Sequence, residues 1–193
     1  VVTISKVTSD IVQTVAPSVE EHYLPHAIPT DIFQKLPELD VKHYRKQSLK
    51  IDDDTFLLFW NNRNARRKQS GSLIFWFNDF LQKIKKTNKK AKAVLLMHTE
   101  PNDPNGQDLY AIINNLGLHN GEVRISTTKV DLPDLARIYN AADATIGISD
   151  AEGFGLATFE SLACETPIIT TMTGGLQEQV TPIETINQSI MLK

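Results

Sequence analysis

The feature that most constrains the fold of this chain is a short apolar segment followed by two glycines and a run of helix-forming residues. Residues 144–148 read ATIGI, as a buried parallel strand should, and they stop at the polar pair at 149–150. Gly153 and Gly155 then permit backbone angles closed to other residues and let a ligand come close to the main chain. Residues 156–164 are good helix formers. The segment therefore predicts a strand, a glycine turn and a helix in succession.

The rest of the chain repeats this alternation of strand and helix patterns. Strands are predicted at residues 1–5, 19–24, 55–61, 93–98, 123–126, 144–148 and 167–171. Helices are predicted from Ser5 to Val15, over 39–49, from about 70, over 108–116, 132–141 and 156–164, and from Leu176. Such alternation predicts an α/β fold whose parallel sheet carries helices on both faces.

Three local features carry more specific predictions. Ser70 is expected to cap the helix that follows it. Aromatic residues cover most of the circumference of that helix, at 75, 76, 77 and 80, which predicts that it is deeply buried. The charged stretch at 39–49 predicts a surface helix instead.

Composition excludes several classes of function. The net charge is -3 and the sequence pI is about 6.0, so a nucleic-acid partner is not expected. The single cysteine, Cys164, excludes an internal disulfide and is expected to pack as a small apolar side chain. No stretch approaches the ~18 apolar residues of a spanning helix, so no transmembrane segment is expected.

The glycine turn and a basic loop together predict an anion site. The free N–H groups of the helix that starts near Leu156 would hold a phosphate, helped by the helix dipole. Glu160 lies about one turn into the helix, where its oxygens could accept hydrogen bonds from a vicinal diol such as a ribose. Glu152 precedes the glycines and would lie close to whatever the phosphate carries. After the strand at 55–61, four cations gather where open α/β sheets bind ligands, namely Arg63, Arg66, Arg67 and Lys68. Taken without any family resemblance, these four residues favour a solvated basic loop.

At these residues the sequence resembles a known family. The ordered set comprises Ser149, Glu152-Gly153-Phe154-Gly155-Leu156, Glu160, Ala163-Cys164, Thr166-Pro167 and Gly174-Gly175. It resembles the E-x7-E signature of retaining glycosyltransferases of the GT-B fold (glycosyltransferase family 4-like). The resemblance implies a Rossmann-like, doubly wound parallel sheet forming one half of a GT-B fold. The sequence departs from the family at Glu165, where glycine is usual, and at Ala157-Thr158, where a more apolar pair is common.

The resemblance also implies roles for individual residues. Glu152 would face the donor sugar as the catalytic residue, and Glu160 would bind the ribose. The backbone of Gly153, Phe154, Gly155 and Leu156 would hold sugar hydroxyls and phosphate. Arg63 and Lys68 would contact the diphosphate, with less weight on Arg67. The implied reaction moves a hexose from a UDP- or GDP-linked donor to an unknown glycan, lipid or protein acceptor, with retention and with neither a metal nor another cofactor.

The same resemblance divides the chain. Residues 1–24 would be the last strand and helix of an otherwise absent N-terminal domain, and 25–38 the hinge. Residues 39–193 would be the nucleotide-sugar-binding domain, without its closing helices. The chain would then bind donor without transferring sugar, since the acceptor side of the cleft is missing. A cytoplasmic location is expected, with any peripheral membrane contact carried by missing parts.

Several alternatives stay open. The glycine turn could be an ordinary strand-to-helix turn or the start of a dinucleotide-binding fingerprint, although position 158 is threonine. The chain could be a non-catalytic nucleotide-binding module, or part of a sugar phosphorylase of the same fold. The aspartates at 52–54 are more consistent with a solvated turn than a metal motif, and His22 and His26 with exposed side chains than a metal pair. The base would lie near Met97 and Ser126, and 187–189 fits a glycosylation sequon.

Overall fold

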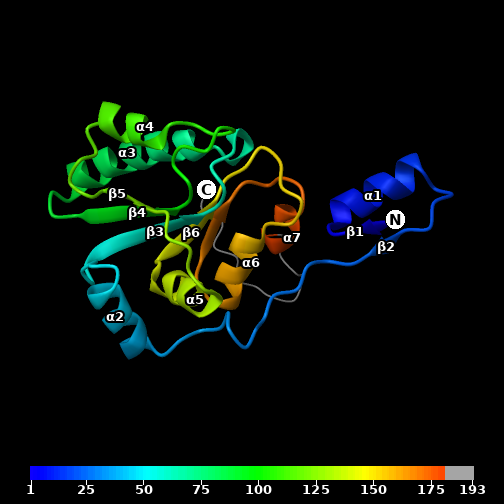
Figure 1. The fold of residues 1–193 in the computed structure, drawn as a ribbon, viewed down its shortest axis with the longest axis horizontal. Coiled ribbons are helices and arrows are strands. Elements are labelled where there is room, and N and C mark those ends of the chain that lie inside the picture. Colours follow the sequence, from blue (N-terminus) through cyan, green and yellow to red (C-terminus); the bar gives the residue numbers. More distant parts are fainter. Residues whose placement is uncertain (181–193) are drawn as a thin grey trace.

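The computed structural model describes residues 1–180 of this chain (Figure 1). Its strands are β1 (Val2–Thr3), β2 (His22–Tyr23), β3 (Thr55–Asn61), β4 (Lys92–His98), β5 (Val123–Ser126), β6 (Ala144–Gly147) and β7 (Ile168–Thr170). Its α-helices are α1 (Lys6–Val15), α2 (Glu38–Gln47), α3 (Ser70–Thr87), α4 (Leu109–Asn115), α5 (Leu132–Ala141), α6 (Leu156–Ala163) and α7 (Leu176–Val180), with a short 3-10 turn η1 at Arg66–Lys68. The predicted sequon lies outside the described residues.

The main sheet has five parallel strands in the order β5-β4-β3-β6-β7. Leu58 in the centre of β3 pairs with Leu95 of β4 on one side and with Ala144 of β6 on the other. Sequence neighbours β3 and β4 lie beside each other, and the chain then crosses over β3 to place β6 and β7 on its other side. This arrangement confirms the predicted α/β fold with a doubly wound parallel sheet.

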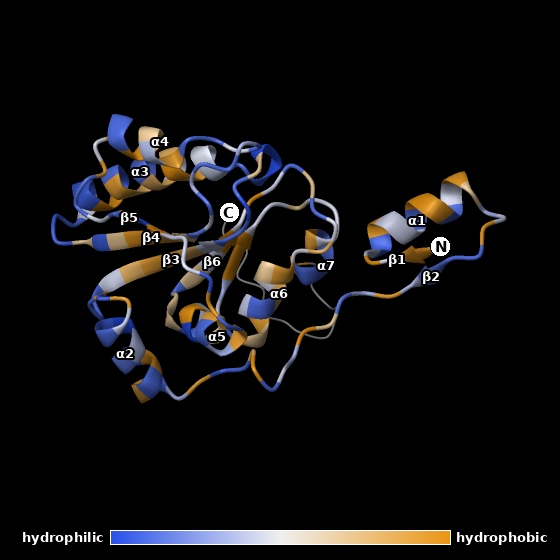
Figure 2. Ribbon diagram, viewed as in Figure 1, coloured by the Kyte–Doolittle hydropathy of each residue, from blue (hydrophilic) through white to orange (hydrophobic). Residues whose placement is uncertain are grey.

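Helices cover both faces of this sheet, as Figure 1 shows for α3 and α4 on one face and α2 and α5 on the other. Successive residues of β3 point to opposite faces, so Leu58 and Trp60 join the core beneath α3 while Leu57 and Phe59 join the core beneath α5. In Figure 2, β3 is drawn in hydrophobic tones and α2 largely in blue. A strand buried on both faces explains why β3 reads as a continuous apolar run.

The first 23 residues form a separate small unit that lies to one side of the main sheet in Figure 1. β1 and β2 pair in parallel, and Ser5 caps α1 by accepting a hydrogen bond from the N–H of Thr8 at 3.4 Å, as predicted. Glu178 of α7 accepts hydrogen bonds from the N–H of Lys6 and the hydroxyl of Tyr23, each at 2.5 Å. The assignment of this unit to another domain stays a prediction.

The prediction that α3 is deeply buried is wrong. Phe75, Trp76 and Phe80 are 52%, 55% and 37% exposed, whereas the buried apolar side consists of Leu73, Ile74, Phe77 and Leu81. The helix packs on the sheet through one stripe at helical spacing, because a straight helix on a sheet offers only one side to it. The number of aromatic residues in α3 therefore overestimates how much of the helix is buried, because only one side of it faces the sheet.

The start of α3 also differs from the prediction. Gln69, in the left-handed region at φ 53°, is the residue that precedes the helix, and it makes no capping hydrogen bond with its side chain. Ser70 is the first helical residue, and its hydroxyl donates to Asn64 Oδ1 at 2.6 Å. The serine therefore ties the preceding loop to the helix instead of capping it.

Helix α2 lies on the surface as predicted, but one of its charged residues is buried. Arg45 is 8% exposed. Its guanidinium donates to the carbonyl of Ala141 at 2.8 Å and to Asp143 Oδ2 at 3.1 Å. The helix is thus fastened to the end of α5 by a charge that is both paired and hydrogen-bonded. No helix within residues 1–180 has the length and apolarity needed to cross a bilayer.

Candidate functional site

A cleft of about 380 Å³ lies beyond the carboxyl ends of β3 and β6. Ligands of open parallel sheets bind at this edge, where the strand order reverses. The lining residues come from the small N-terminal unit, the linker, the end of β3 and the loop after it, α5, the glycine turn and α6. They are Ile4, His26, Asn61, Asn62, Lys68, Leu135, Glu152, Gly153, Phe154, Gly155, Leu156, Ala157 and Glu160. Lys68, the two predicted glutamates and residues 153–156 therefore line one cleft, whereas Arg63, Arg66 and Arg67 do not line it.

The glycine turn places the start of α6 at the cleft. Gly155 precedes the helix with φ 92°, a left-handed conformation that explains the need for glycine. The first helical hydrogen bond runs from the N–H of Phe159 to the carbonyl of Gly155, at 3.1 Å. The amides of residues 156–158 precede that bond, so their N–H groups belong to the free first turn that can hold an anion.

Gly153 does not need its glycine for backbone geometry, which corrects the prediction. Its φ is not positive, and an added Cβ would meet only the side chain of Ile4, at 3.4 Å. The residue is exposed and lines the cleft. The prediction that a ligand approaches the main chain at this position stays a prediction.

A second glycine turn supports the first from behind. The N–H of Gly175 donates to the carbonyl of Glu152 at 2.9 Å. A Cβ at Gly174 would lie 1.9 Å from the oxygen of Glu152, and one at Gly175 would lie 2.3 Å from the oxygen of Gly153. The two turns pack backbone against backbone, so the pair at 174–175 fixes the position of Glu152. Both glycine turns therefore lie at the same edge of the sheet.

Hydrogen bonds between two loops bring Lys68 to Glu152. Ser149 Oγ donates to the carbonyl of Arg67 at 3.0 Å, and the N–H of Asp150 donates to the same carbonyl at 2.8 Å. Lys68 is 8% exposed, and its Nζ makes a close ion pair with Glu152 Oε2. Arg67 Nη1 lies 3.4 Å from the same carboxylate oxygen. The buried ammonium of Lys68 and the carboxylate of Glu152, the predicted catalytic residue, are therefore in contact beside the glycine turn.

Arg63 lies in the same loop but points elsewhere. It makes a bidentate ion pair with Asp103, at 2.5 Å from Nε and 3.1 Å from Nη2. This guanidinium lowers the pKa of the Asp103 carboxyl to about 2. The Arg63 side chain is 64% exposed and does not line the cleft. Its contact with a diphosphate stays a prediction.

Glu160 faces the cleft with a buried phenol behind it. Tyr139 of α5 donates from its hydroxyl to Glu160 Oε2 at 2.7 Å, and Asn61 at the end of β3 donates to the Tyr139 oxygen at 2.9 Å. Burial raises the pKa of the Glu160 carboxyl, and the hydrogen bond from Tyr139 partly opposes that rise. Burial likewise raises the pKa of the Cys164 thiol to about 11, and Cys164 packs in the core as predicted.

Sequence reasoning missed Tyr139, Asn61, Asn62, His26 and Ile4 as cleft residues or their neighbours. The polar pair at 61–62, directly after an apolar strand, was a usable signal. Tyr139 gave none, since one tyrosine on a helix reads as an ordinary core residue. His26 lies edge-on to Phe154 with ring centroids 5.2 Å apart, while His22 pairs with Glu20 at 3.2 Å.

The acidic run at 52–54 lies at the opposite end of the sheet from the cleft. Lys92 pairs with Asp52 at 3.2 Å and with Asp54 at 3.4 Å. Within residues 1–180 no cluster of three histidine, cysteine or acidic side chains is placed to hold a metal ion.

Glu165 and Thr158, which depart from the family pattern, each make specific hydrogen bonds in the structure. Glu165 adopts φ 58°, the left-handed conformation in which glycine carries no penalty, and its carboxylate accepts from Lys35 Nζ at 2.7 Å. Thr158 is buried, and its hydroxyl bonds the carbonyl of Gly155 at 2.9 Å and Gln179 Oε1 at 2.6 Å. The threonine therefore helps to fasten α7 to the glycine turn.

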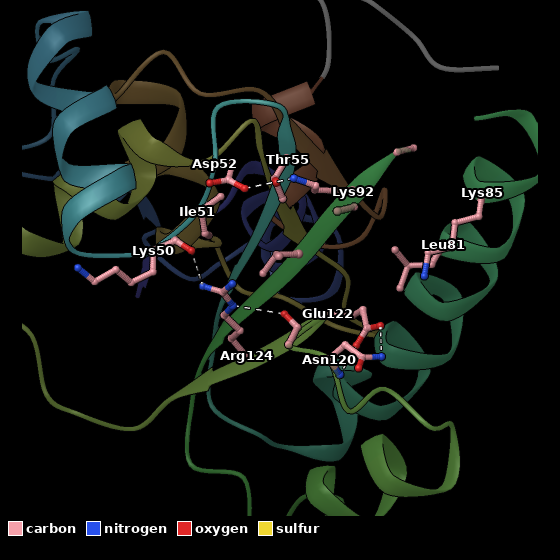
Figure 3. A pocket seen from close by; sticks show the side chains of 14 residues that line it. Lys50, Ile51, Asp52, Thr55, Leu81, Lys85, Lys92, Asn120, Glu122 and Arg124 are labelled. Carbon is pink, nitrogen blue, oxygen red and sulfur yellow. Dashed lines mark hydrogen bonds and ion pairs between the residues drawn. The ribbon is translucent and has the colours of Figure 1, made fainter. Parts of the chain in front are cut away.

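A second hollow, of about 310 Å³, lies at the amino end of the same sheet (Figure 3). Its basic residues include Lys50, Lys85, Lys92 and Arg124. Arg124 donates to the carbonyl of Leu49 at 2.7 Å, and Lys92 is held by the aspartates described above. It holds none of the predicted site residues and lies at the edge of the sheet that parallel α/β proteins rarely use for ligands.

Comparison with known proteins identifies the family to which this chain is similar. Residues 40–188 match the family described as Glycosyl transferases group 1. D-inositol 3-phosphate glycosyltransferase from Arthrobacter sp. (strain FB24) is 34% identical over 73 residues, covering 38% of this chain and 17% of that protein. The protein of the same name from Mycobacterium sp. (strain KMS) is 40% identical over 78 residues, covering 38% of this chain and 18% of that protein.

Solved structures resemble nearly the whole chain in fold. Sucrose-phosphate synthase from Thermosynechococcus elongatus has a TM-score of 0.71 at 22% identity, over 95% of this chain and 43% of that one. Alr3699/HepE from Anabaena, in complex with UDP and glucose, has a TM-score of 0.70 at 18% identity, over 94% of this chain and 46% of that one.

This chain thus spans less than half of each of those two proteins, and at such identities the likeness concerns the fold. The family match, in contrast, covers well over half of this chain. The chain therefore belongs to the glycosyl transferases of group 1, with the Rossmann-like fold of one half of a GT-B glycosyltransferase.

Proposed function

We propose that this chain is the donor-binding domain of a retaining, metal-independent hexosyltransferase that uses a nucleotide-diphosphate sugar. One observation carries the proposal. Lys68, Glu152, the start of α6 and Glu160 line a single cleft at the carboxyl edge of the sheet. These groups offer a cation, free backbone N–H groups and two separated carboxylates, which suit a diphosphate, a sugar and a ribose.

The diphosphate would lie between Lys68 and the first turn of α6. When the bond between the sugar's anomeric carbon and the diphosphate oxygen breaks, negative charge develops on the leaving oxygen. A buried ammonium and preorganised N–H groups stabilise that charge without reorganising. An acceptor hydroxyl forms the new bond on the same face of the sugar, and its proton leaves with the diphosphate. No step requires a metal, since protein groups supply the positive charge.

Glu152 would face the sugar. In the structure its carboxylate pairs with Lys68 and lies 3.4 Å from Arg67. Binding of a diphosphate would give Lys68 a second anionic partner, and Glu152 would then be free to accept hydrogen bonds from sugar hydroxyls. The cations thus link the diphosphate and sugar ends of the site.

The acceptor would be presented by a part of the protein opposite the cleft. This chain spans 43 to 46% of the similar solved structures named above. The curated relatives are named for D-inositol 3-phosphate, so an inositol phosphate is the first acceptor to test. Without a facing wall no acceptor hydroxyl is oriented, and the chain alone is expected to bind donor without transferring sugar, because orientation contributes up to ~7 to 11 kcal/mol of barrier lowering.

The experiment is a thermal-shift screen of this chain against NAD and against UDP-, GDP- and ADP-glucose and -mannose, with each nucleotide sugar compared with its free nucleoside and repeated with EDTA. The proposal expects a stabilising shift with at least one nucleotide sugar, none with nucleosides, and no effect of the chelator. Shifts with NAD and none with any nucleotide sugar would support the dinucleotide alternative. Binding here, with no transfer to any acceptor when an acceptor-presenting domain is supplied, would favour the non-catalytic module.

A further inference from the structure

The buried tyrosine behind Glu160 has the geometry of a residue that controls it. Tyr139 is 0% exposed. Its ring packs edge-on against Phe59 and Phe33, with centroids 5.2 Å and 6.1 Å away. Its hydroxyl is therefore held at one point, from which it reaches Glu160 Oε2 at 2.7 Å. Because the Tyr139 hydroxyl is held in place, its hydrogen bond restricts the Glu160 side chain, which could otherwise adopt several rotamers.

Asn61 sets the direction of the hydrogen bonds that link Asn61, Tyr139 and Glu160. Asn61 presents its amide nitrogen to the Tyr139 oxygen at 2.9 Å, and an amide nitrogen only donates. The single phenolic hydrogen is thus left for Glu160. Burial and the neighbouring carboxylate raise the pKa of Tyr139 well above its usual value, so the phenol keeps this hydrogen. Asn61 therefore donates to Tyr139, and Tyr139 donates to Glu160.

We propose that Tyr139 is a positioning residue: it holds one oxygen of Glu160, so that the other oxygen of this cleft-lining carboxylate is presented to the ribose of the nucleotide. This inference rests on the proposed function, because it presumes a nucleotide in the cleft. Tyr139 does not line the cleft itself. It acts on the ligand only through Glu160, and the expected signature is a change in how strongly binding depends on the ribose hydroxyls.

Of the titratable and charged groups around Glu160 within residues 1–180, Tyr139 is the one that donates a hydrogen bond to its carboxylate. Cys164, the residue that follows α6, has a neutral thiol, since the pKa of that thiol is raised to about 11. Lys68, Glu152 and His26 line the same cleft. Within residues 1–180 the hydrogen bond from Tyr139 is the one that reaches the Glu160 carboxylate.

The test is Tyr139→Phe, which removes the hydroxyl and keeps the ring. Calorimetry compares UDP with 2′,3′-dideoxy-UDP, and GDP with its dideoxy analogue, on the wild type and the variant. Phe33→Leu is the matched control, because it loosens the packing around the same ring without touching Glu160. The expected result is a loss of about tenfold in affinity for the ribonucleotide in Tyr139→Phe, with little change for the dideoxy analogue. Phe33→Leu should keep the wild-type ratio.

A pH profile adds a readout that a purely structural role would not move. With UDP-glucose, whose phosphates have no ionisation near neutral pH, binding should weaken as Glu160 is protonated. Since the phenol lowers the pKa of Glu160, Tyr139→Phe should shift this loss to higher pH. Equal losses for ribo- and dideoxynucleotides, or an unshifted profile, would overturn the inference. If the wild type binds neither UDP nor GDP, the proposed function itself fails.

Discussion

The two glutamates of the cleft occupy different electrostatic surroundings although they lie on the same short segment. Glu152 pairs with Lys68 and approaches Arg67, so its charge is balanced by cations. Glu160 instead accepts from the neutral phenol of Tyr139, and burial raises its pKa. Groups whose surroundings differ in this way usually serve different roles in a site. Their substitutions should therefore have different effects.

Glu160→Gln should weaken binding of a nucleoside diphosphate even when no sugar is attached, by about 1.5 to 3 kcal/mol, as expected for a lost charge-assisted hydrogen bond. Glu152→Gln should leave nucleoside diphosphate binding nearly intact and reduce the rate of sugar transfer when an acceptor-presenting domain is supplied. Calorimetry with UDP and GDP, followed by a transfer assay, measures both. The reverse pattern would exchange the two roles.

Gly153 offers a substitution that separates folding from binding. An added methyl group meets only the flexible end of Ile4, and φ is not positive. Gly153→Ala should therefore keep the wild-type melting temperature within about 2 °C and weaken nucleotide-sugar binding, because the methyl group enters the ligand's space. Gly155→Ala is the contrasting control, since φ 92° predicts a loss of stability. Unchanged binding in a folded Gly153→Ala variant would remove this backbone from the site.

At the scale of elements, apolar patterns predicted β3, β5 and α5 with their observed bounds, because buried strands and amphipathic helices leave clear periodic signals. The burial of α3 was not predictable from its aromatic content, since Phe75 and Trp76 face away from the sheet. Nor did the charged pattern of α2 reveal that Arg45 is buried, because its partners at Ala141 and Asp143 are distant in sequence. Long-range partners leave no local signal.

Glu165, which lies between α6 and β7, has a backbone conformation that is unfavourable for any residue with a side chain. Glu165→Gly should raise the free energy of unfolding by up to about 1 kcal/mol, because φ 58° costs a side chain about 1 to 2 kcal/mol and glycine loses more entropy on folding. The exposed pair with Lys35 that it removes contributes little. Glu165→Ala is the matched control, as it removes the pair but keeps the Cβ. Chemical denaturation measures both, and a Gly variant no more stable than the Ala variant would contradict this account.

At the scale of the whole molecule, strand order and loop ends brought together residues that the sequence had separated. Lys68 and Glu152 were predicted to converge at one edge of the sheet, and they form an ion pair there. Arg63 was placed in the same group by its position in the basic loop and by the family resemblance, and in the structure it pairs with Asp103. The contribution of Ile4 and His26 to the cleft could not be predicted, because it depends on where the small N-terminal unit and the linker lie.

The central claim is that the cleft binds the diphosphate of a nucleotide through Lys68 and the start of α6. The most direct measurement is calorimetry of UDP against uridine and GDP against guanosine, on the wild type, Lys68→Met and Lys85→Met. Lys85 is the matched control, since it lines the basic hollow at the opposite edge of the sheet (Figure 3). The account predicts that at least one diphosphate binds far more tightly than its nucleoside, that Lys68→Met reduces this preference by about tenfold or more, and that Lys85→Met preserves it. Equal affinity for nucleotide and nucleoside in the wild type, or an equal loss in both variants, would contradict it.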